Sequence, residues 1–216
     1  AEFRFWTEAR FFGLQVGGDV NVQDVRFLGG TDFSESNITG DFNAKATRRG
    51  STFFRGFANF FKMQVGGDVS IERACFIDSV NFSDSHIRGK FDSRSVQYGQ
   101  AIANFSNLKV DRSLLLSNAC FINSATFNYA SITTQFEADS LQFQPTSDGA
   151  YVDFFKMQVG GDASIQKATF IGLVNFSDSH FMGNLYLHHT IFYTTNFAYL
   201  TVERDLKATS VQFEGT

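Results

Sequence analysis

The feature that most constrains the fold is a phenylalanine that returns about every 22 residues along the chain, at positions 11, 33, 60, 82, 105, 127, 154, 176 and 197. Between these positions, apolar residues fall about five apart, as in Phe60, Val65, Ile71 and Phe76. A helix repeats every 3.6 residues and a strand every 2.0, so a step of five fits neither. The spacing predicts a chain that turns a corner about every five residues.

A longer repeat lies over this one. Residues 60–87 and 154–181 are identical at 21 of 28 positions, and each begins with Phe-Phe-Lys-Met-Gln-Val-Gly-Gly-Asp. The string Gln-Val-Gly-Gly-Asp-Val also begins at Gln15. The composition agrees, because 28 phenylalanines beside one tryptophan and one proline indicate one structural slot that is filled repeatedly.

The local unit is a small residue, a polar residue, phenylalanine and two polar residues, as in 80–84 (VNFSD), 103–107 (ANFSN) and 125–129 (ATFNY). These residues resemble the pentapeptide-repeat family. The resemblance implies an all-β fold: a right-handed, four-sided parallel β-helix, or β-solenoid, of about nine coils. Each coil has about two residues more than four pentapeptides, so we expect one corner to bulge. We expect one domain over 1–216, with an irregular segment at 1–10 and coils over 11–216.

Charge and apolar runs exclude several classes of protein. The 18 basic and 22 acidic residues give a net charge of −4, so we expect no direct binding to nucleic acid. No apolar run approaches the length of about 18 residues that spans a bilayer. The resemblance implies a bacterial protein, and the sequence leaves its compartment open between the cytoplasm and the cell envelope or exterior.

Residues that could carry chemistry do not assemble into a site, so we expect no enzyme, no cofactor and no metal. Cys75 and Cys120 are expected to point outward as free thiols, because two coils place their Cα atoms about 10 Å apart, too far for a disulfide. Crosslinking of these thiols between chains stays open. His86 and His180 occupy one repeat position four coils apart, too distant to share a metal. The glycine pairs that begin at 17, 66 and 160 indicate a corner with positive φ or close backbone approach.

Two excesses of residues interrupt the repeat, near 48–58 and 144–151. We expect both to project as loops from one face, because they fall at one point of the longer repeat. The first is basic and aromatic, a composition common at binding surfaces. The candidate partner-binding residues of the two loops are Arg48, Arg49, Phe53, Phe54, Arg55, Pro145, Asp148 and Tyr151.

The two ends of the sequence match the repeat frame at Ala1-Glu2-Phe3 and at Val211-Gln212-Phe213, and neither has an amphipathic helix to cap it. Uncapped solenoids expose strand edges that associate. Either the chain belongs to a longer solenoid or its ends stack on other copies. The leading hypothesis is a non-enzymatic structural or protein-interaction solenoid that assembles end to end, into dimers or filaments. The alternatives are a DNA-mimicking regulator of a bacterial type II topoisomerase, which the family resemblance implies, and a carbohydrate- or surface-binding module.

Overall fold

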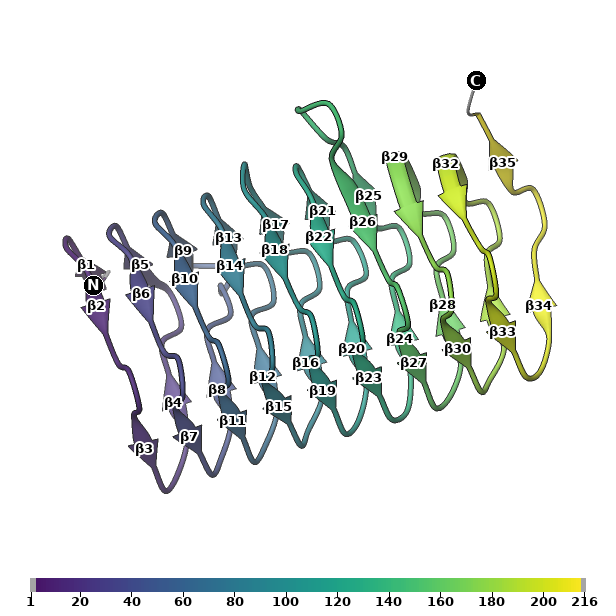
Figure 1. Cartoon of the computed structure of the whole chain (residues 1–216). Coiled ribbons are helices and arrows are strands. Elements are labelled where there is room, and N and C mark those ends of the chain that lie inside the picture. The colour runs from purple at the N-terminus through teal and green to yellow at the C-terminus, as the bar shows by residue number, and fades with distance from the viewer. Residues whose placement is uncertain (1–2, 215–216) are drawn as a thin grey trace.

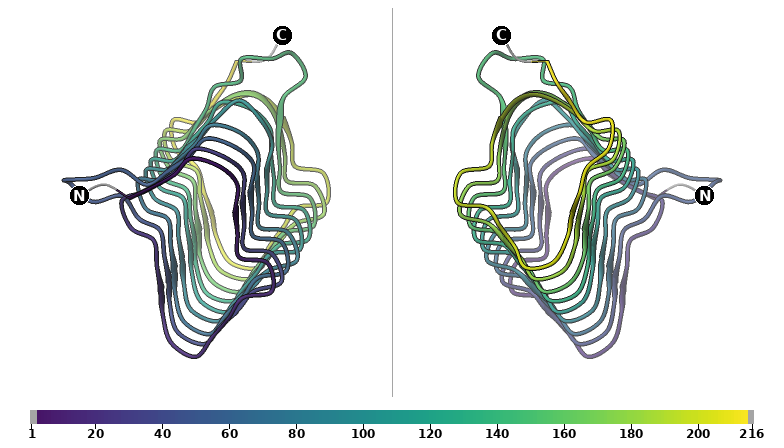
Figure 2. Two further views of the ribbon diagram at one scale, coloured as in Figure 1. Left: turned by 90° about the vertical axis from the view of Figure 1, so that its left-hand side faces the viewer. Right: turned by 90° about the vertical axis from the view of Figure 1, so that its right-hand side faces the viewer.

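The computed structural model describes residues 3–214, which form a rod of stacked coils without a helix among them. Every strand pairing is parallel, and the strands form one sheet of 17 strands and two sheets of nine. Figure 1 shows the coils in side view and Figure 2 shows them end on. The predicted β-solenoid is therefore confirmed, with nine complete coils and the first strand of a tenth.

Each coil has four sides, numbered here in chain order, and sides 1 and 2 belong to the large sheet. Side 1 consists of β1 (Phe3–Phe5), β5 (Val25–Phe27), β9 (Phe53–Phe54), β13 (Cys75–Phe76), β17 (Gln97–Tyr98), β21 (Cys120–Phe121), β25 (Gln142–Phe143), β29 (Thr169–Asn175), β32 (Ile191–Asn196) and β35 (Gln212–Phe213), each of which begins a coil. Side 2 consists of the far halves of β29 and β32 together with β2 (Ala9–Arg10), β6 (Thr31–Asp32), β10 (Ala58–Asn59), β14 (Val80–Asn81), β18 (Ala103–Asn104), β22 (Ala125–Thr126) and β26 (Tyr151–Asp153).

Sides 3 and 4 are the two nine-stranded sheets. Side 3 consists of β3 (Gln15–Val16), β7 (Asn37–Ile38), β11 (Gln64–Val65), β15 (His86–Ile87), β19 (Lys109–Val110), β23 (Ser131–Ile132), β27 (Gln158–Val159), β30 (His180–Phe181) and β33 (Thr201–Val202). Side 4 consists of β4 (Val20–Asn21), β8 (Phe42–Asn43), β12 (Val69–Ser70), β16 (Phe91–Asp92), β20 (Leu114–Leu115), β24 (Phe136–Glu137), β28 (Ala163–Ser164), β31 (Leu185–Tyr186) and β34 (Leu206–Lys207).

The small-polar-Phe unit is explained by side 2. The Asn81 side chain accepts a hydrogen bond from the Ser83 N–H (3.0 Å), which closes a local turn, and donates one to Asn59 of the coil before (3.3 Å). Between them, Phe82 points inward and stacks on Phe60 with ring centroids 4.4 Å apart. The polar residue of the repeat unit therefore forms the turn, and the phenylalanine that follows it packs in the core.

The core is a set of aromatic ladders that run along the rod axis. The predicted phenylalanines form one unbroken stack from Phe11 to Phe197, with centroid separations of 4.4–5.7 Å. A second stack on side 1 includes Tyr98, whose hydroxyl pairs with Ser93 inside the core. Burial raises the pKa of Tyr98 far above its ordinary value. Each buried ring contributes about 1.5–3 kcal/mol, partly offset by conformational entropy.

The two extra residues of each coil are shared between two corners, so the expectation of one bulging corner was wrong. A residue with positive φ stands at the corner between sides 2 and 3, such as Lys62 (φ 54), and another between sides 4 and 1, such as Arg73 (φ 60). Each of these corners has six residues between equivalent strand positions, and the other two have five. The segment expected to be irregular also contains strands β1 and β2, while Ala1 and Glu2 lie outside the described residues.

Candidate interaction surfaces

The two loops leave the rod at different corners, which overturns the expectation that they share a face (Figure 2). The first separates β8 from β9, between sides 4 and 1, and the second separates β25 from β26, between sides 1 and 2. Both lengthen a coil from about 22 to 27 residues. The number of residues between successive phenylalanines does not show at which corner the extra residues lie. This is why the two loops were predicted to lie on one face.

The first loop is held by a network around Asp24. Its carboxylate accepts hydrogen bonds from the N–H (2.8 Å) and the hydroxyl (2.7 Å) of Thr47, and Thr52 accepts the Asp24 N–H (2.9 Å). Arg48 and Arg49 are exposed at the tip. This network presents the two guanidinium groups on a defined loop.

Three predicted residues of the first loop belong to β9 or follow it directly. Phe54 is buried in the side-1 stack between Phe27 (4.9 Å) and Phe76 (4.6 Å), so it cannot contact a partner. Phe53 is half-buried on the outer face, and Arg55 is exposed. Phe54 was wrongly included because the sequence does not show which ring of the Phe-Phe pair points inward.

The predicted binding residues of the second loop differ in how far they are exposed to solvent. Asp148 is exposed at the tip, Pro145 is half-buried, and Tyr151 is half-buried in β26. The loop is tied to the coil before it by the Thr146 N–H on the Ile122 carbonyl (3.2 Å) and the Tyr151 N–H on the Ser124 hydroxyl (3.2 Å).

The histidines and cysteines lie where the repeat places them. His86 contacts Asp111 of the next coil (2.9 Å). Burial tends to raise the pKa of Asp111, but the hydrogen bond and charge of His86 and the charge of Lys109 outweigh it and lower the pKa. Within residues 3–214, no three His, Cys, Asp or Glu residues gather into a group that could hold a metal ion.

Cys75 and Cys120 are free thiols on the outer face of side 1, as predicted, with Gln97 between them. Both are half-buried, and this burial raises the pKa of each thiol.

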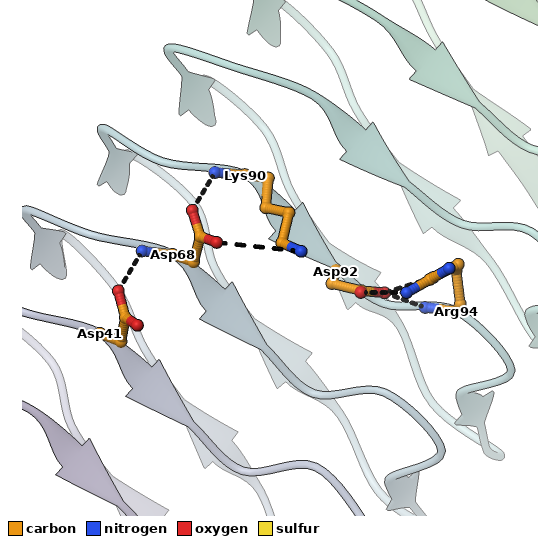
Figure 3. Close-up of polar contacts among 5 residues, drawn as sticks. All are labelled: Asp41, Asp68, Lys90, Asp92 and Arg94. Atoms are coloured by element: carbon orange, nitrogen blue, oxygen red, sulfur yellow. Dashed lines mark hydrogen bonds and ion pairs between the residues drawn. The ribbon is translucent and has the colours of Figure 1, made fainter.

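A ladder of carboxylates runs along the corner between sides 3 and 4, where each aspartate caps the coil that follows. Asp19 accepts the N–H of Asp41 (2.9 Å), Asp41 that of Asp68 (2.8 Å) and Asp68 that of Lys90 (2.9 Å). Figure 3 shows the middle of this ladder, beside the separate Asp92–Arg94 pair on side 4 (2.6 Å). Asn184 continues the ladder near the other end by accepting the Asp205 N–H (3.2 Å).

The glycines before these aspartates are explained by close approach. A Cβ on Gly67 would collide with the Asp41 carboxylate, and one on Gly66 would collide with the Thr39 carbonyl. None of the paired glycines has a positive φ, so of the two reasons expected for them only close approach holds. Gly17 and Gly18 differ from the rest, because in the first coil nothing lies within 4 Å of either Cβ position.

Comparison with known families agrees with the coil geometry. Residues 154–201 match the family model described as pentapeptide repeats, nine copies. The matched stretch contains most of 154–181, which repeats 60–87, and the same coil continues over the described chain. The matched stretch belongs to the pentapeptide-repeat family. No curated protein matched it.

The pentapeptide-repeat solenoid is a structural, non-catalytic fold. Across residues 3–214, no helix is long and apolar enough to cross a membrane. A repeat solenoid of this kind is typical of protein interaction, so the exposed ends and corners of the rod are its candidate surfaces.

Both ends of the pentapeptide rod expose apolar core. At the C-terminal end, a hollow of about 460 Å³ is lined chiefly by Leu185, Phe197, Leu200, Val202, Leu206 and Phe213. At the other end, Phe5, Phe11, Leu14 and Val16 are only partly buried against the core. The repeat frame at both termini predicted open ends, but the roles of Asp19 and Asp205 were not recognised from the sequence, although Gly-Asp recurs at 18, 40, 67 and 161.

Proposed function

We propose that this protein is a non-enzymatic interaction scaffold whose coils stack head to tail on further copies of the chain. The observation that carries the proposal is that the two ends have the chemistry of two neighbouring coils. Inside the rod, Asp19 caps the N–H of Asp41, and Gly40 leaves room for that carboxylate. At a joint between copies, Asp205 would take the role of Asp19, and the Gly18-Asp19 pair that of Gly40-Asp41.

The apolar surface of the two ends supports the same arrangement. Leu206 (58% exposed) stands where the next coil would cover it, and at the other end Phe11 and Val20 are only partly buried against the core of the first coil. Stacking would add the parallel strand pairing that every internal coil has, so it removes strand edges as well as apolar area from water.

One strand has to move at such a joint. A continuous helix needs β35 of one copy to be followed by β2 of the next, and this gives β35 and β1 the same place on side 1. Removing residues 208–216 deletes β35 and leaves β1 to occupy that place. We therefore expect the shortened chain to associate at least as tightly as the full chain.

The test is sedimentation velocity over a wide range of protein concentration. The unaltered chain should form oligomers that grow with concentration, and Gly18→Leu should weaken the association about tenfold or more while the midpoint of urea unfolding stays unchanged. Ser147→Leu, which adds the same side chain on the second loop, is the matched control and should associate normally. A monodisperse species at every concentration, or equal behaviour of the two variants, would refute end-to-end stacking.

A further inference from the structure

The corner between sides 1 and 2 carries at least one large apolar side chain in every coil, and we name this set of side chains the ridge. Each of the nine coils contributes to it, with Trp6, Leu28, Phe57, Ile77, Ile102, Ile122, Tyr151, the pair Ile171 and Leu173, and Tyr193. Of the 14 large hydrophobic side chains that are exposed within residues 3–214, seven belong to the ridge. An apolar line of this length on a rod is typical of an interaction surface.

The fold does not demand this ridge, because no other corner carries a large outward apolar side chain in every coil. The corner between sides 2 and 3 has exposed aromatic residues in some coils, such as Tyr129 and Tyr199, but polar residues in others, such as Ser83-Asp84. The corner between sides 3 and 4 carries mainly glycines and aspartates, and the corner between sides 4 and 1 carries polar pairs such as Glu72-Arg73. The core beneath the ridge is completed by separate buried residues such as Phe76 and Phe121. The ridge side chains are therefore a property of the surface.

Charge is distributed unevenly along the ridge and its flanking strands. In the first three coils these strands carry four arginines and two acidic residues: Arg4, Arg10, Arg26, Arg55, Glu8 and Asp32. From the fourth coil onward the same stretches of sequence contain no lysine or arginine, and they carry Asp78, Asp148, Asp153 and Glu214. One end of the ridge is thus basic and the other acidic, so the ridge is complementary to itself when it is reversed.

The geometry points to a second copy of this chain, packed antiparallel along the ridge, as the partner. Closed two-fold pairing is the commonest form of association between identical chains. With the two-fold axis at the fifth coil, Ile102 meets its own copy, Ile77 meets Ile122, and Arg55 lies opposite the loop that carries Asp148.

The second loop supports this register. It rises above the ridge in the seventh coil and would meet the third coil of the other copy near Gly56, with Gly30 of the second coil beside it. A Cβ on Gly30 would make only an ordinary contact at 3.7 Å, so close approach of the coils does not explain that glycine, whereas it does explain Gly56, whose Cβ would lie 2.9 Å from the Gly29 backbone. A flat lipid surface would instead meet the polar tip of this loop before it reached most of the ridge.

The size of the surface is sufficient for a specific but moderate interaction. Nine coils at about 4.8 Å give a ridge about 40 Å long, and the four or five residues that cross the corner give a width of about 15 Å. Each copy would then bury about 600 Å², or about 1,200 Å² in total, at the lower end of specific interfaces. We therefore expect a dimer that dissociates in the micromolar range. This pairing is independent of the end-to-end stacking proposed above.

The first test is charge reversal, measured by sedimentation at low ionic strength in the Gly18→Leu variant, so that end-to-end association is suppressed. Arg55→Asp and Asp148→Arg should each weaken the dimer about tenfold, and the double variant should regain most of the lost affinity. Arg112→Asp, an exposed charge at the corner between sides 3 and 4, is the matched control. Two single losses that simply add in the double variant would overturn the antiparallel register.

The second test uses the two-fold axis itself. In a background of Cys75→Ser and Cys120→Ser, Ile102→Cys should form an intermolecular disulfide under mild oxidation, because a residue on the axis meets its own copy. Ile171→Cys lies three coils from the axis and should remain uncrosslinked. No crosslink at Ile102→Cys, or equal crosslinking of the two variants, would rule out the pairing, whatever the outcome for stacking at the ends.

Discussion

Replacing Gly67 by alanine should destabilise the protein, whereas the equivalent change at Gly18 should not. A Cβ at Gly67 would collide with the Asp41 carboxylate and would also lie 3.0 Å from the backbone carbonyl of Gly40. The carboxylate can escape only by rotating away, and it then gives up its hydrogen bond to the Asp68 N–H (2.8 Å). A hydrogen bond to a charged group contributes about 1.5–3 kcal/mol.

Alanine also has a compensating effect, because it restricts the unfolded chain relative to glycine and so adds about 0.4–1 kcal/mol of stability. The net loss for Gly67→Ala is therefore about 0.5–2.5 kcal/mol. Gly18→Ala makes no new contact in the single chain and should be neutral or slightly stabilising. Urea unfolding followed by circular dichroism, at a concentration where the chain is monomeric, measures both. An equal loss in the two variants would show that backbone conformation, and not close approach between coils, keeps these glycines.

Other consequences of the coil geometry can be measured in the same way. Phe105→Ala removes a buried ring from the middle of the longest stack and should cost about 3–5 kcal/mol, whereas Phe12→Ala on the exposed first coil should cost little. Because burial raises the pKa of Cys75 and Cys120, a thiol reagent should react with them more slowly than with glutathione at neutral pH, and a rate equal to that of glutathione would contradict this. Burial tends to raise the pKa of Asp111, but His86 lowers it below the ordinary value of 3.8. The His86–Asp111 pair therefore adds its full stabilisation to the folded chain above pH 3.8, and this stabilisation is lost as the pH falls through the lowered pKa. Asp111→Asn should flatten the acid side of the pH–stability profile, and an unchanged slope would argue against the pair.

The coil was predictable from the sequence because the inward position that follows each side-2 strand holds a phenylalanine in all nine coils. Phe60, Phe82 and Phe105 stack on one another at 4.4 and 5.7 Å, so a polar or small residue in their place would leave a void. This is why the spacing of phenylalanine alone predicted the coil. The polar residue before each phenylalanine was also recognisable, because the turn at Asn81 needs a short side chain that hydrogen-bonds its own backbone.

The conformations of the corners were harder to predict from the sequence, because the number of residues between phenylalanines gives only the total length of a coil. The positive φ at Lys62 and Arg73 has no signature of its own, since both side chains are long and tolerate the exposed corner. The same ambiguity assigned the two loops to one face. In each case the sequence determined how many residues a coil holds but not which corner holds them.

The ridge was invisible in the sequence for a related reason. Ile77 and Ile122 follow the inward aromatic residue of side 1, whereas Ile102 precedes the inward alanine of side 2, so their spacings of 25 and 20 residues match no period. Only the fold superposes these positions, because the two rows converge on one corner. An outward residue in one coil has no packing reason to recur, and the line it forms with its neighbours exists only once the coils are stacked. A surface that a solenoid builds by adding small contributions from every coil therefore has no motif, and it has to be sought in the structure, corner by corner, against the composition of the other corners.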